Sequence, residues 1–179
     1  ASSGGGINIA SGGDATVTNS TLSGNSAAIN GGGIFNDSFG SATVTNSTLS
    51  GNTADNGGGI SNYYGTATVT NSTLSGNTAD LGGGIFNYGG TATVTNSTLS
   101  GNTADFNGGG IFNNNYGTAT VTNSIVLGNI AGTDAEISGT VTNTDDLSII
   151  GGVNAADVFA VTANGAGVLA DNGGPVQTI

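Results

Sequence analysis

The only side chains of this protein that carry a charge at neutral pH are carboxylates, because the 179 residues include 11 Asp and Glu but no Lys, Arg or His. A carboxylate-only enzyme, such as a glycosidase, needs two of these groups about 5–10 Å apart in unequal environments. Asp145 and Asp146 are the only pair adjacent in sequence, and we expect them to lie in a loop. We therefore predict that the protein is not an enzyme.

Three aspartates are candidates for a metal site because they share one position in successive copies of a repeat. Asp55, Asp80 and Asp105 follow one another at intervals of 25 residues. Stacked carboxylates repel one another, and Ca²⁺ would relieve that repulsion. However, the Gly-Gly-x-Gly-x-Asp repeat of calcium-binding rolls is absent, and aspartates at turns commonly accept hydrogen bonds from nearby backbone amides. We favour solvated turn aspartates and keep Ca²⁺ as the only candidate cofactor.

Threonine alternates with apolar residues in the recurring Thr-Ala-Thr-Val-Thr segments, which places Thr on one side of a strand. If such strands stack, the outward threonines form a flat grid, spaced ~6.7 Å along a strand and ~4.8 Å between strands. This grid is similar to the Thr-x-Thr face of β-helical ice-binding proteins. The simpler alternative is that Thr is favoured on any exposed strand. The candidate grid consists of Thr43, Thr45, Thr68, Thr70, Thr93, Thr95, Thr120 and Thr122.

Most aromatic residues fall in the recurring Gly-Gly-Gly-Ile strand or in the turn after it. A Phe that follows an inward Ile should point outward. A contiguous exposed aromatic stripe marks a contact surface, which could bind sugar rings or pack against another part of the protein. We favour packing over sugar binding. The candidate contact surface consists of Phe35, Tyr63, Phe86, Tyr88, Phe112 and Tyr116.

These candidates recur because the chain is built from repeats of one phrase, Val-Thr-Asn-Ser-Thr-Leu-Ser-Gly-Asn. The first five copies start 27, 25, 25 and 27 residues apart. A period of this size indicates a stacked array of small units rather than a closed globule. Intact copies begin at Val17, Val44, Val69 and Val94, and degraded copies begin at Val121 and Val141.

One repeat has the pattern of three short strands. Residues 91–95 alternate Thr with Ala and Val, residues 97–103 are centred on Leu99, and Ile111 centres a third apolar stretch after an expected turn at 105–109. The Thr, Val, Asn and Gly content excludes a helix. Each such strand buries only one or two aliphatic side chains, so the coils must be stabilised by stacking on one another.

The sequence therefore predicts an all-β fold with three strands per coil. We expect about six coils of 25–27 residues over residues 1–146, followed by an irregular segment, residues 147–179. Equivalent residues of stacked coils should form columns along the solenoid.

One of these columns consists of asparagines at the point where the strand alternation slips. Asn tolerates the left-handed conformation that such a turn requires. If the side chains also point inward, their amides can hydrogen-bond along the stack as an asparagine ladder. The turn alone explains the residue type equally well. The column consists of Asn19, Asn46, Asn71, Asn96, Asn123 and Asn143.

The repeated Thr-Ala-Thr-Val-Thr-Asn-Ser-Thr-Leu-Ser-Gly-Asn-Thr-Ala and Gly-Gly-Gly-Ile-Phe-Asn phrases resemble right-handed parallel β-helix repeats of the pectate-lyase-like superfamily. With the Leu-Ala-Asp-Asn-Gly-Gly-Pro-Val-Gln-Thr segment at 169–178, they look in particular like bacterial secreted proteins with choice-of-anchor β-helices. The resemblance implies a right-handed coil. Lyases of that superfamily use a basic residue to abstract a proton, and this chain has none, so the resemblance implies the fold without the activity.

Composition limits the partners. Without basic side chains the protein has nothing to neutralise phosphates, so we expect no nucleic-acid partner. A polybasic membrane contact is excluded for the same reason, and no apolar run is long enough to cross a bilayer. A chain without Cys, Lys or Arg suits an exposed protein that resists oxidation and trypsin-like cleavage. We therefore expect a secreted or cell-surface location.

The fifth copy departs from the repeat. Ile125 and Leu127 occupy positions that are Thr and Ser in earlier copies, so they would be exposed unless something covers them. We predict that part of residues 147–179, around Val158 to Leu169, folds back over them.

The ends of the predicted solenoid suggest how it assembles. Unpaired strand edges at a terminal coil are templates for pairing with another chain, and we see no capping element before Ile7. Open ends favour head-to-tail contact between copies, which yields a filament. The candidate inter-subunit residues are Ile7, Ile9, Val176 and Ile179.

These observations favour an extracellular, non-enzymatic structural solenoid, a subunit of a surface or secreted filament or adhesin. The alternatives are an ice-binding protein that uses the Thr grid and a carbohydrate-binding module that uses the aromatic stripe.

Overall fold

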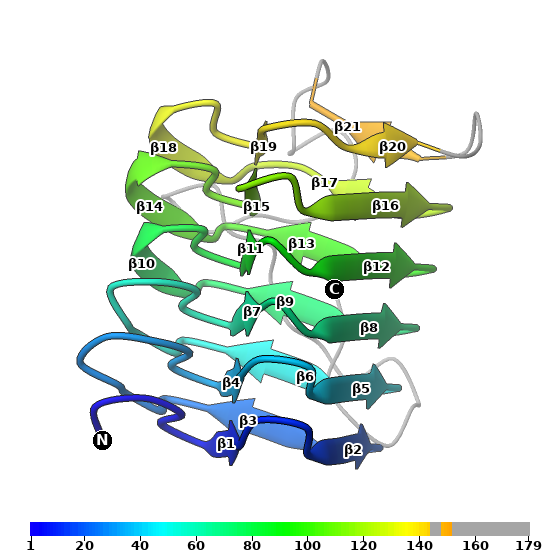
Figure 1. Cartoon of the computed structure of the whole chain (residues 1–179). Coiled ribbons are helices and arrows are strands. Elements are labelled where there is room, and N and C mark those ends of the chain that lie inside the picture. Colours follow the sequence, from blue (N-terminus) through cyan, green and yellow to red (C-terminus); the bar gives the residue numbers. More distant parts are fainter. Residues whose placement is uncertain (144–147, 152–179) are drawn as a thin grey trace.

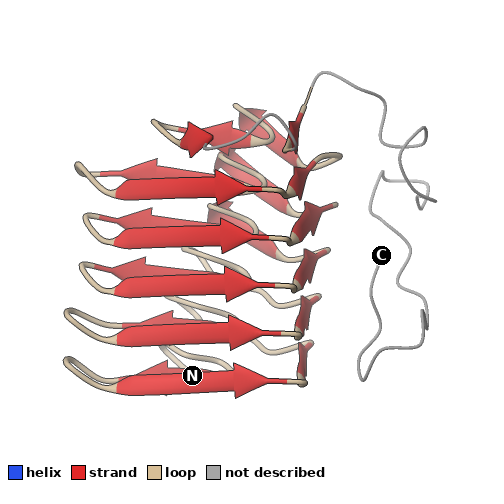
Figure 2. Cartoon of the chain, turned by 90° about the vertical axis from the view of Figure 1, so that its right-hand side faces the viewer, coloured by secondary structure: helices blue, strands red, loops and turns tan. Residues whose placement is uncertain are grey.

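The structure, a computed structural model, describes residues 1–143 and 148–151, and these form an all-parallel β-solenoid of about five coils (Figure 1). The coils follow one another in chain order, and their strands lie in level layers when the stack is turned by 90° (Figure 2). Within these residues, no helix is long and apolar enough to cross a membrane.

Three six-stranded sheets and one three-stranded sheet run along the stack. The Ile sheet contains β1 (Ile7–Ile9), β4 (Ile34–Asn36), β7 (Ile60–Tyr63), β11 (Ile85–Tyr88), β15 (Ile111–Asn114) and β19 (Ile137–Ser138). The Thr sheet contains β2 (Asp14–Thr18), β5 (Ser41–Thr45), β8 (Thr66–Thr70), β12 (Thr91–Thr95), β16 (Thr118–Thr122) and β20 (Thr142–Asn143). The Leu sheet contains β3 (Thr21–Ser23), β6 (Thr48–Ser50), β9 (Thr73–Ser75), β13 (Thr98–Ser100), β17 (Ile125–Val126) and β21 (Ile149–Ile150). The short sheet contains β10 (Thr78–Leu81), β14 (Thr103–Asn107) and β18 (Ile130–Thr133).

Identical apolar residues pair from coil to coil and build the core. Val44, Val69 and Val94 are direct partners in the Thr sheet and are at most 1 % exposed. The Leu sheet contributes Leu49, Leu74 and Leu99 in the same way, and the Ile sheet contributes its first residue from each coil. Most strands of the Thr sheet and the Leu sheet alternate these residues with Thr or Ser, because successive side chains of a strand point to opposite faces. The predicted solenoid and its stacked core are confirmed.

Two details of the predicted coil are wrong. The third to fifth coils contain a fourth short strand, because residues 103–107, expected to end one strand and begin a turn, instead form β14, which pairs with β10 and β18. The coils number about five rather than six, because the sixth copy contributes only short pieces of strand. Its register also differs from the sequence alignment, since Asn143 pairs with Val121 rather than extending the column of Asn123.

The asparagines that end the strands of the Thr sheet adopt the left-handed conformation that the slip in alternation requires. Their φ angles lie between 45° and 50°, a region that Asn enters more readily than most residues. These residues are Asn19, Asn46, Asn71, Asn96 and Asn123.

The outer face of the Leu sheet is more buried than its polar residues suggest. Leu127 is buried and Ile125 is half-buried, although both alternate with the inward Val126. Thr73 and Ser75, which alternate with the inward Leu74, are also buried. The segment predicted to cover this face, around Val158 to Leu169, lies outside the described residues, so the cover stays a prediction.

Candidate functional site

The interior of the solenoid holds a ladder of asparagine amides that runs along the stack. In each step Nδ2 of one Asn donates to Oδ1 of the next at 2.9 Å. The second Nδ2 proton goes to a Leu carbonyl one coil back, as from Asn77 to Leu49 at 3.0 Å. Each Oδ1 also accepts from the backbone of the preceding Asn. From Asn52 to Asn129 the amides are therefore fully hydrogen-bonded without water. This first ladder consists of Asn25, Asn52, Asn77, Asn102 and Asn129.

A second internal ladder follows the ends of the Ile-sheet strands. Nδ2 of each Asn donates to Oδ1 of the next at 2.7 Å and to the carbonyl of the glycine that precedes the next strand of its own coil. The ladder begins at Asn36, whose Oδ1 is buried without a hydrogen-bond partner. Its partner in the first coil is Ile9, which has no donor to offer. This second ladder consists of Asn36, Asn62, Asn87 and Asn113.

Serines between the Thr sheet and the Leu sheet form a third row. The backbone N–H of each Ser donates to Oγ of the Ser one coil on, at 3.1–3.2 Å. From the second to the fifth coil, Oγ in turn donates to the carbonyl two residues earlier at 2.7–2.8 Å. Each hydroxyl is thus both donor and acceptor. The row consists of Ser20, Ser47, Ser72, Ser97, Ser124 and Ser148.

Glu136 ends the first ladder. Its carboxylate accepts Asn129 Nδ2 at 2.6 Å, the Gly128 backbone N–H at 2.9 Å and the Asn129 backbone N–H at 3.4 Å. A carboxylate accepts hydrogen bonds and donates none, so it satisfies the last amide without extending the ladder. Burial raises the pKa of the Glu136 carboxyl, and the hydrogen bonds from Asn129 and Gly128 act in the opposite direction.

The asparagine column singled out from the sequence lies outside the core rather than inside it. Asn71 and Asn96 are exposed and Asn46 is half-buried. Their amides still form an external row, from Asn123 to Asn96 at 2.8 Å, from Asn96 to Asn71 at 3.2 Å and from Asn71 to Asn46 at 3.3 Å. Asn19 is exposed at the start of this column. Asn143 belongs to β20, and its side chain is outside the described set.

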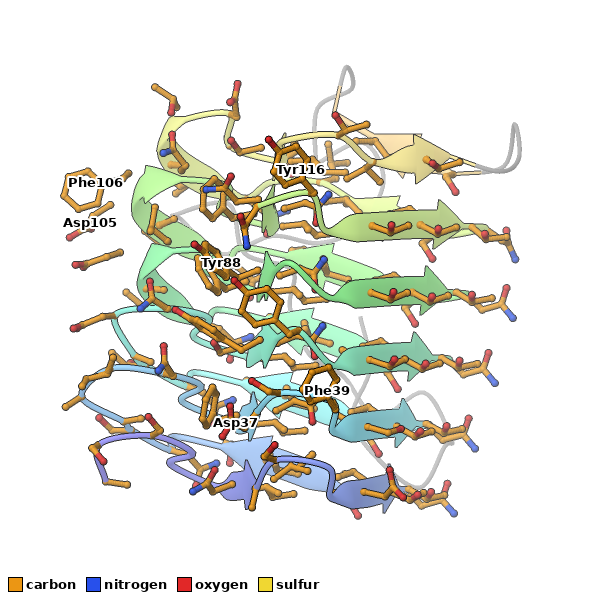
Figure 3. All side chains as sticks on the ribbon, in the orientation of Figure 1. Asp37, Phe39, Tyr88, Asp105, Phe106 and Tyr116 are labelled. Carbon is orange, nitrogen blue, oxygen red and sulfur yellow. The ribbon has the colours of Figure 1, made fainter. Side chains whose placement is uncertain are left out.

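The threonine grid exists as a regular array on the outer face of the Thr sheet. Thr68 pairs with Thr43 and Thr93, and Thr93 pairs with Thr120, without a register shift. The neighbouring column, Thr45 to Thr122, has the same register, and its members are half-buried like the first column. Rows of short side chains on β5, β8, β12 and β16 repeat in one orientation (Figure 3).

The aromatic stripe is a cluster that packs largely on itself. Ser61 interrupts the column between Phe35 and Phe86, and it is completely buried. The ring of Tyr63 fills this gap, because its centroid lies 5.9 Å from that of Phe35 and 5.6 Å from that of Phe86. Tyr88 stacks on Phe86 with 4° between their planes.

Burial differs among the members of the aromatic stripe. Phe86 is only 3 % exposed, whereas Phe35, Tyr63, Tyr88 and Phe112 are half-buried. Phe112 joins the cluster through Phe86, at 5.6 Å between centroids. Burial raises the pKa of the Tyr63 hydroxyl, and the neighbouring Tyr88 and Tyr64 add to this effect. These aromatic residues stabilise the wall of the solenoid and present only part of their surface.

The most exposed aromatics near this wall lie in the turn that leads into the Thr sheet. Phe39 and Tyr116 are 82 % and 103 % exposed, and Tyr64 is 47 % exposed. All three have left-handed backbones, with φ of 61°, 59° and 50°. Gly12 and Gly89 occupy the equivalent turns of the first and fourth coils with φ of 71° and 67°. For a residue with a Cβ the left-handed conformation costs roughly 1–2 kcal/mol, so the turn itself favours glycine here.

Tyr64 shows why the fourth coil carries glycine in this turn. A Cβ added to Gly89 would lie 2.4 Å from the Tyr64 ring, so this ring lies against the Gly89 backbone. The Tyr64 hydroxyl accepts a hydrogen bond from Asn115 Nδ2 at 2.8 Å, 51 residues along the chain. Tyr64 also meets Tyr88 edge to face, at 5.6 Å between centroids. Two of the three turn aromatics, Phe39 and Tyr116, make no ring contact within the described residues.

The three candidate calcium ligands do not form a metal site. Asp55, Asp80 and Asp105 are exposed, and in the part of the chain that the structure describes no group of three or more His, Cys, Asp or Glu side chains could hold a metal ion. Asp105 lies at the left edge of the view in Figure 3, away from Tyr88 and Tyr116.

The first coil leaves its apolar core partly open. Ile7, Ala15 and Leu22 are only partly buried, while Ile9 is 4 % exposed. Their partners in the second coil are fully covered. Those partners are Ile34, Ala42 and Leu49. Val176 and Ile179, the candidate residues of the other end, lie outside the described residues.

Comparison of the chain with protein-family models, curated proteins and solved structures found no match. The arrangement of its own residues therefore carries the functional argument.

Proposed function

We propose that the protein is a non-enzymatic structural rod of a secreted or cell-surface assembly. The observation that carries this proposal is the use of the interior polar residues. Two asparagine ladders and a serine row connect each coil to the next, which stabilises the stack and commits the amide nitrogens of the ladder to contacts within the solenoid. A chain whose polar interior is committed to holding its own coils together is suited to keep a length and a shape.

We also propose a family relation for this chain. The repeat phrases support a relation to the right-handed β-helices of the pectate-lyase-like superfamily, and in particular to secreted choice-of-anchor proteins. The internal ladders are compatible with that relation. The same chain lacks any basic side chain, so the proposal excludes the superfamily's lyase chemistry.

Head-to-tail contact between copies is the mode of assembly that we propose. The half-buried Ile7, Ala15 and Leu22 form an apolar end, and among the described strands β1, β2 and β3 each have a partner on one side only. A coil of a second copy matches this end because coils of this chain already pair with near-identical coils. Such a heterologous contact does not close on itself and extends into a filament.

Electron microscopy and sedimentation across a range of concentrations test the assembly. We expect short filaments from the parent chain and monomers from Leu22→Asp, which places a charge on the open end. Thr93→Asp is the matched control, since Thr93 lies on the outer face in the middle of the stack. Monomers of the parent chain at high concentration would refute head-to-tail assembly.

A second candidate function, ice binding, is favoured by the register of the Thr sheet. Three successive pairings align identical Thr pairs over four coils without a bulge. We expect Thr93→Tyr, which breaks the grid, to abolish thermal hysteresis, while Thr78→Tyr on the short sheet leaves it intact. Absence of thermal hysteresis in the parent protein refutes this candidate.

A further inference from the structure

We propose that the turn aromatics Phe39, Tyr64 and Tyr116 form a binding surface for a neutral polysaccharide. This inference goes beyond the structural rod and does not depend on self-assembly. It also differs from the aromatic stripe of the Ile sheet, whose rings largely pack on one another.

The first argument comes from the choice of residue in the turn. The same turn is made by Gly12 and Gly89 in other coils, so the fold does not require an aromatic ring there. A bulky residue with positive φ is an outlier, and such outliers cluster at functional positions. Phe39 and Tyr116 are also mostly or fully exposed, so they contribute little to the core.

The second argument is the alignment of the three residues. The Phe39 backbone N–H donates to the Tyr64 carbonyl at 3.3 Å, which places the two turns on neighbouring coils. Tyr64 extends across the fourth coil to Asn115, which is adjacent to Tyr116. The three rings therefore follow one corner of the solenoid, and Figure 3 shows Phe39 and Tyr116 at the starts of β5 and β16 on the same side.

The third argument is a shallow cavity beside Tyr116. It has a volume of about 260 Å³ and is lined by Asn114, Tyr116 and Thr140, among others. Asn114 and Thr140 are exposed. In residues 1–143 and 148–151, the Asn114 amide nitrogen and the Thr140 hydroxyl make no hydrogen bond. A ring face next to free amide and hydroxyl groups suits a ligand with an apolar face and a hydroxylated rim.

Charge selects among such ligands. The side chains of this protein carry no positive charge and the net charge is −11. An anionic polymer would be repelled, because the chain has no guanidinium or ammonium side chain to pair with its carboxylates or sulfates. A pyranose ring of a neutral polysaccharide combines an apolar face with hydroxyl groups and carries no charge. Successive sugar rings along one chain can contact successive aromatic side chains along the solenoid axis.

Affinity electrophoresis in gels that contain hydroxyethyl cellulose, laminarin, galactomannan or polygalacturonate tests the proposal. We expect the parent protein to be retarded by at least one neutral polymer and not by polygalacturonate. Phe39→Gly and Tyr116→Gly should each weaken this retardation about tenfold. Both variants should fold, because glycine already occupies the turn elsewhere, and circular dichroism checks this.

Phe106→Ala is the matched control. Phe106 is also an exposed aromatic, at 60 %, but it belongs to β14 and lies at the left edge of the view, away from Phe39 and Tyr116 (Figure 3). It should leave retardation unchanged. The proposal is overturned if no neutral polymer retards the parent, if Phe106→Ala has the same effect as Tyr116→Gly, or if the glycine variants bind as well as the parent. A change in sedimentation without a change in retardation would instead identify the row as a contact between copies, and it would also overturn the proposal.

Discussion

Ile9 and Asn36 are direct partners in the parallel pairing of β1 with β4, and Ile9 leaves Asn36 Oδ1 buried without a donor. Every later step of the second ladder supplies that donor from an asparagine at the same position. The ladder therefore has a direction, because in each step Nδ2 of one Asn donates to Oδ1 of the Asn in the following coil. Its first acceptor stays unused because the first coil carries an aliphatic residue in the asparagine position.

Ile9→Asn should be nearly neutral for stability. The new Nδ2 would donate to Asn36 Oδ1, which offsets the aliphatic burial that is lost, so we expect a change within about 1 kcal/mol. Ile34→Asn is the control. Ile34 lies in an apolar column, so the side-chain amide of the new Asn would find no hydrogen-bond partner there. That variant should lose roughly 3–5 kcal/mol. Urea denaturation measures both, and equal losses would show that the vacant acceptor has no energetic effect.

Asn77→Ala should destabilise the protein strongly, whereas Asn71→Gly should not. Asn77 is buried, and its removal leaves Asn102 Oδ1 without its amide donor and Asn52 Nδ2 without its acceptor. Each unsatisfied buried group costs about 1–3 kcal/mol. Asn71 is exposed and glycine suits its φ of 49°, so we expect a change within about 0.5 kcal/mol. Thermal unfolding compares the pair, and similar melting temperatures for the two variants would contradict the internal ladder.

Glu136 should make stability depend on pH. Its folded-state pKa is raised by burial, so between the ordinary value and the raised value the folded protein binds more protons than the unfolded chain. The free energy of unfolding therefore falls as the pH rises through this window. Glu136→Gln removes this contribution and keeps an acceptor for Asn129. We expect the variant to gain stability relative to the parent as the pH rises from the ordinary carboxyl pKa through the raised one in urea titrations, and a constant difference would contradict the assignment.

The sequence alone was sufficient for the solenoid because each copy repeats Val, Leu and Ile at fixed positions, and this repetition requires stacking. It was insufficient for the ladders. Asn46 and Asn52 recur with the same period, so periodicity does not distinguish the external amide from the internal one. The distinction depends on which way the chain turns after the Thr sheet, and the left-handed backbone at Asn46 directs that side chain outward.

Of the three turn aromatics, the candidate contact surface predicted from the sequence included only Tyr116. Tyr116 was grouped with Phe112 because they are neighbours in the chain, yet Phe112 contacts Phe86 and Tyr116 is fully exposed. A signal was present, since three coils carry an aromatic residue where the first and fourth carry Gly12 and Gly89, directly before the Gly that leads into the Thr strand. The sequence alone does not reveal that the glycines at this position have a positive φ, because glycine adopts positive and negative φ about equally readily.

Phe39→Gly and Tyr116→Gly should not reduce stability. Glycine relieves the left-handed strain of roughly 1–2 kcal/mol and loses about 0.5–1 kcal/mol through the greater freedom of the unfolded chain. We expect each variant to equal the parent or exceed it by up to about 1 kcal/mol. Phe106→Gly, in a strand, should instead lose stability. Guanidinium denaturation makes the comparison, and a loss above about 1 kcal/mol at Phe39 would show that its ring makes a stabilising contact.

Ile125 and Leu127 allow a test of the predicted cover over the Leu sheet. Both point away from the core in the fifth coil, and Leu127 is only 2 % exposed. The double variant Ile125→Thr, Leu127→Ser restores the residue types of the earlier coils and removes two apolar contacts from the outer face. If part of residues 147–179 packs there, the variant should lose about 2–5 kcal/mol and thermolysin should cleave this segment faster. If the outer face is bare, exchanging exposed aliphatic residues for Thr and Ser on a strand should change stability by no more than about 0.5 kcal/mol, with unaltered cleavage.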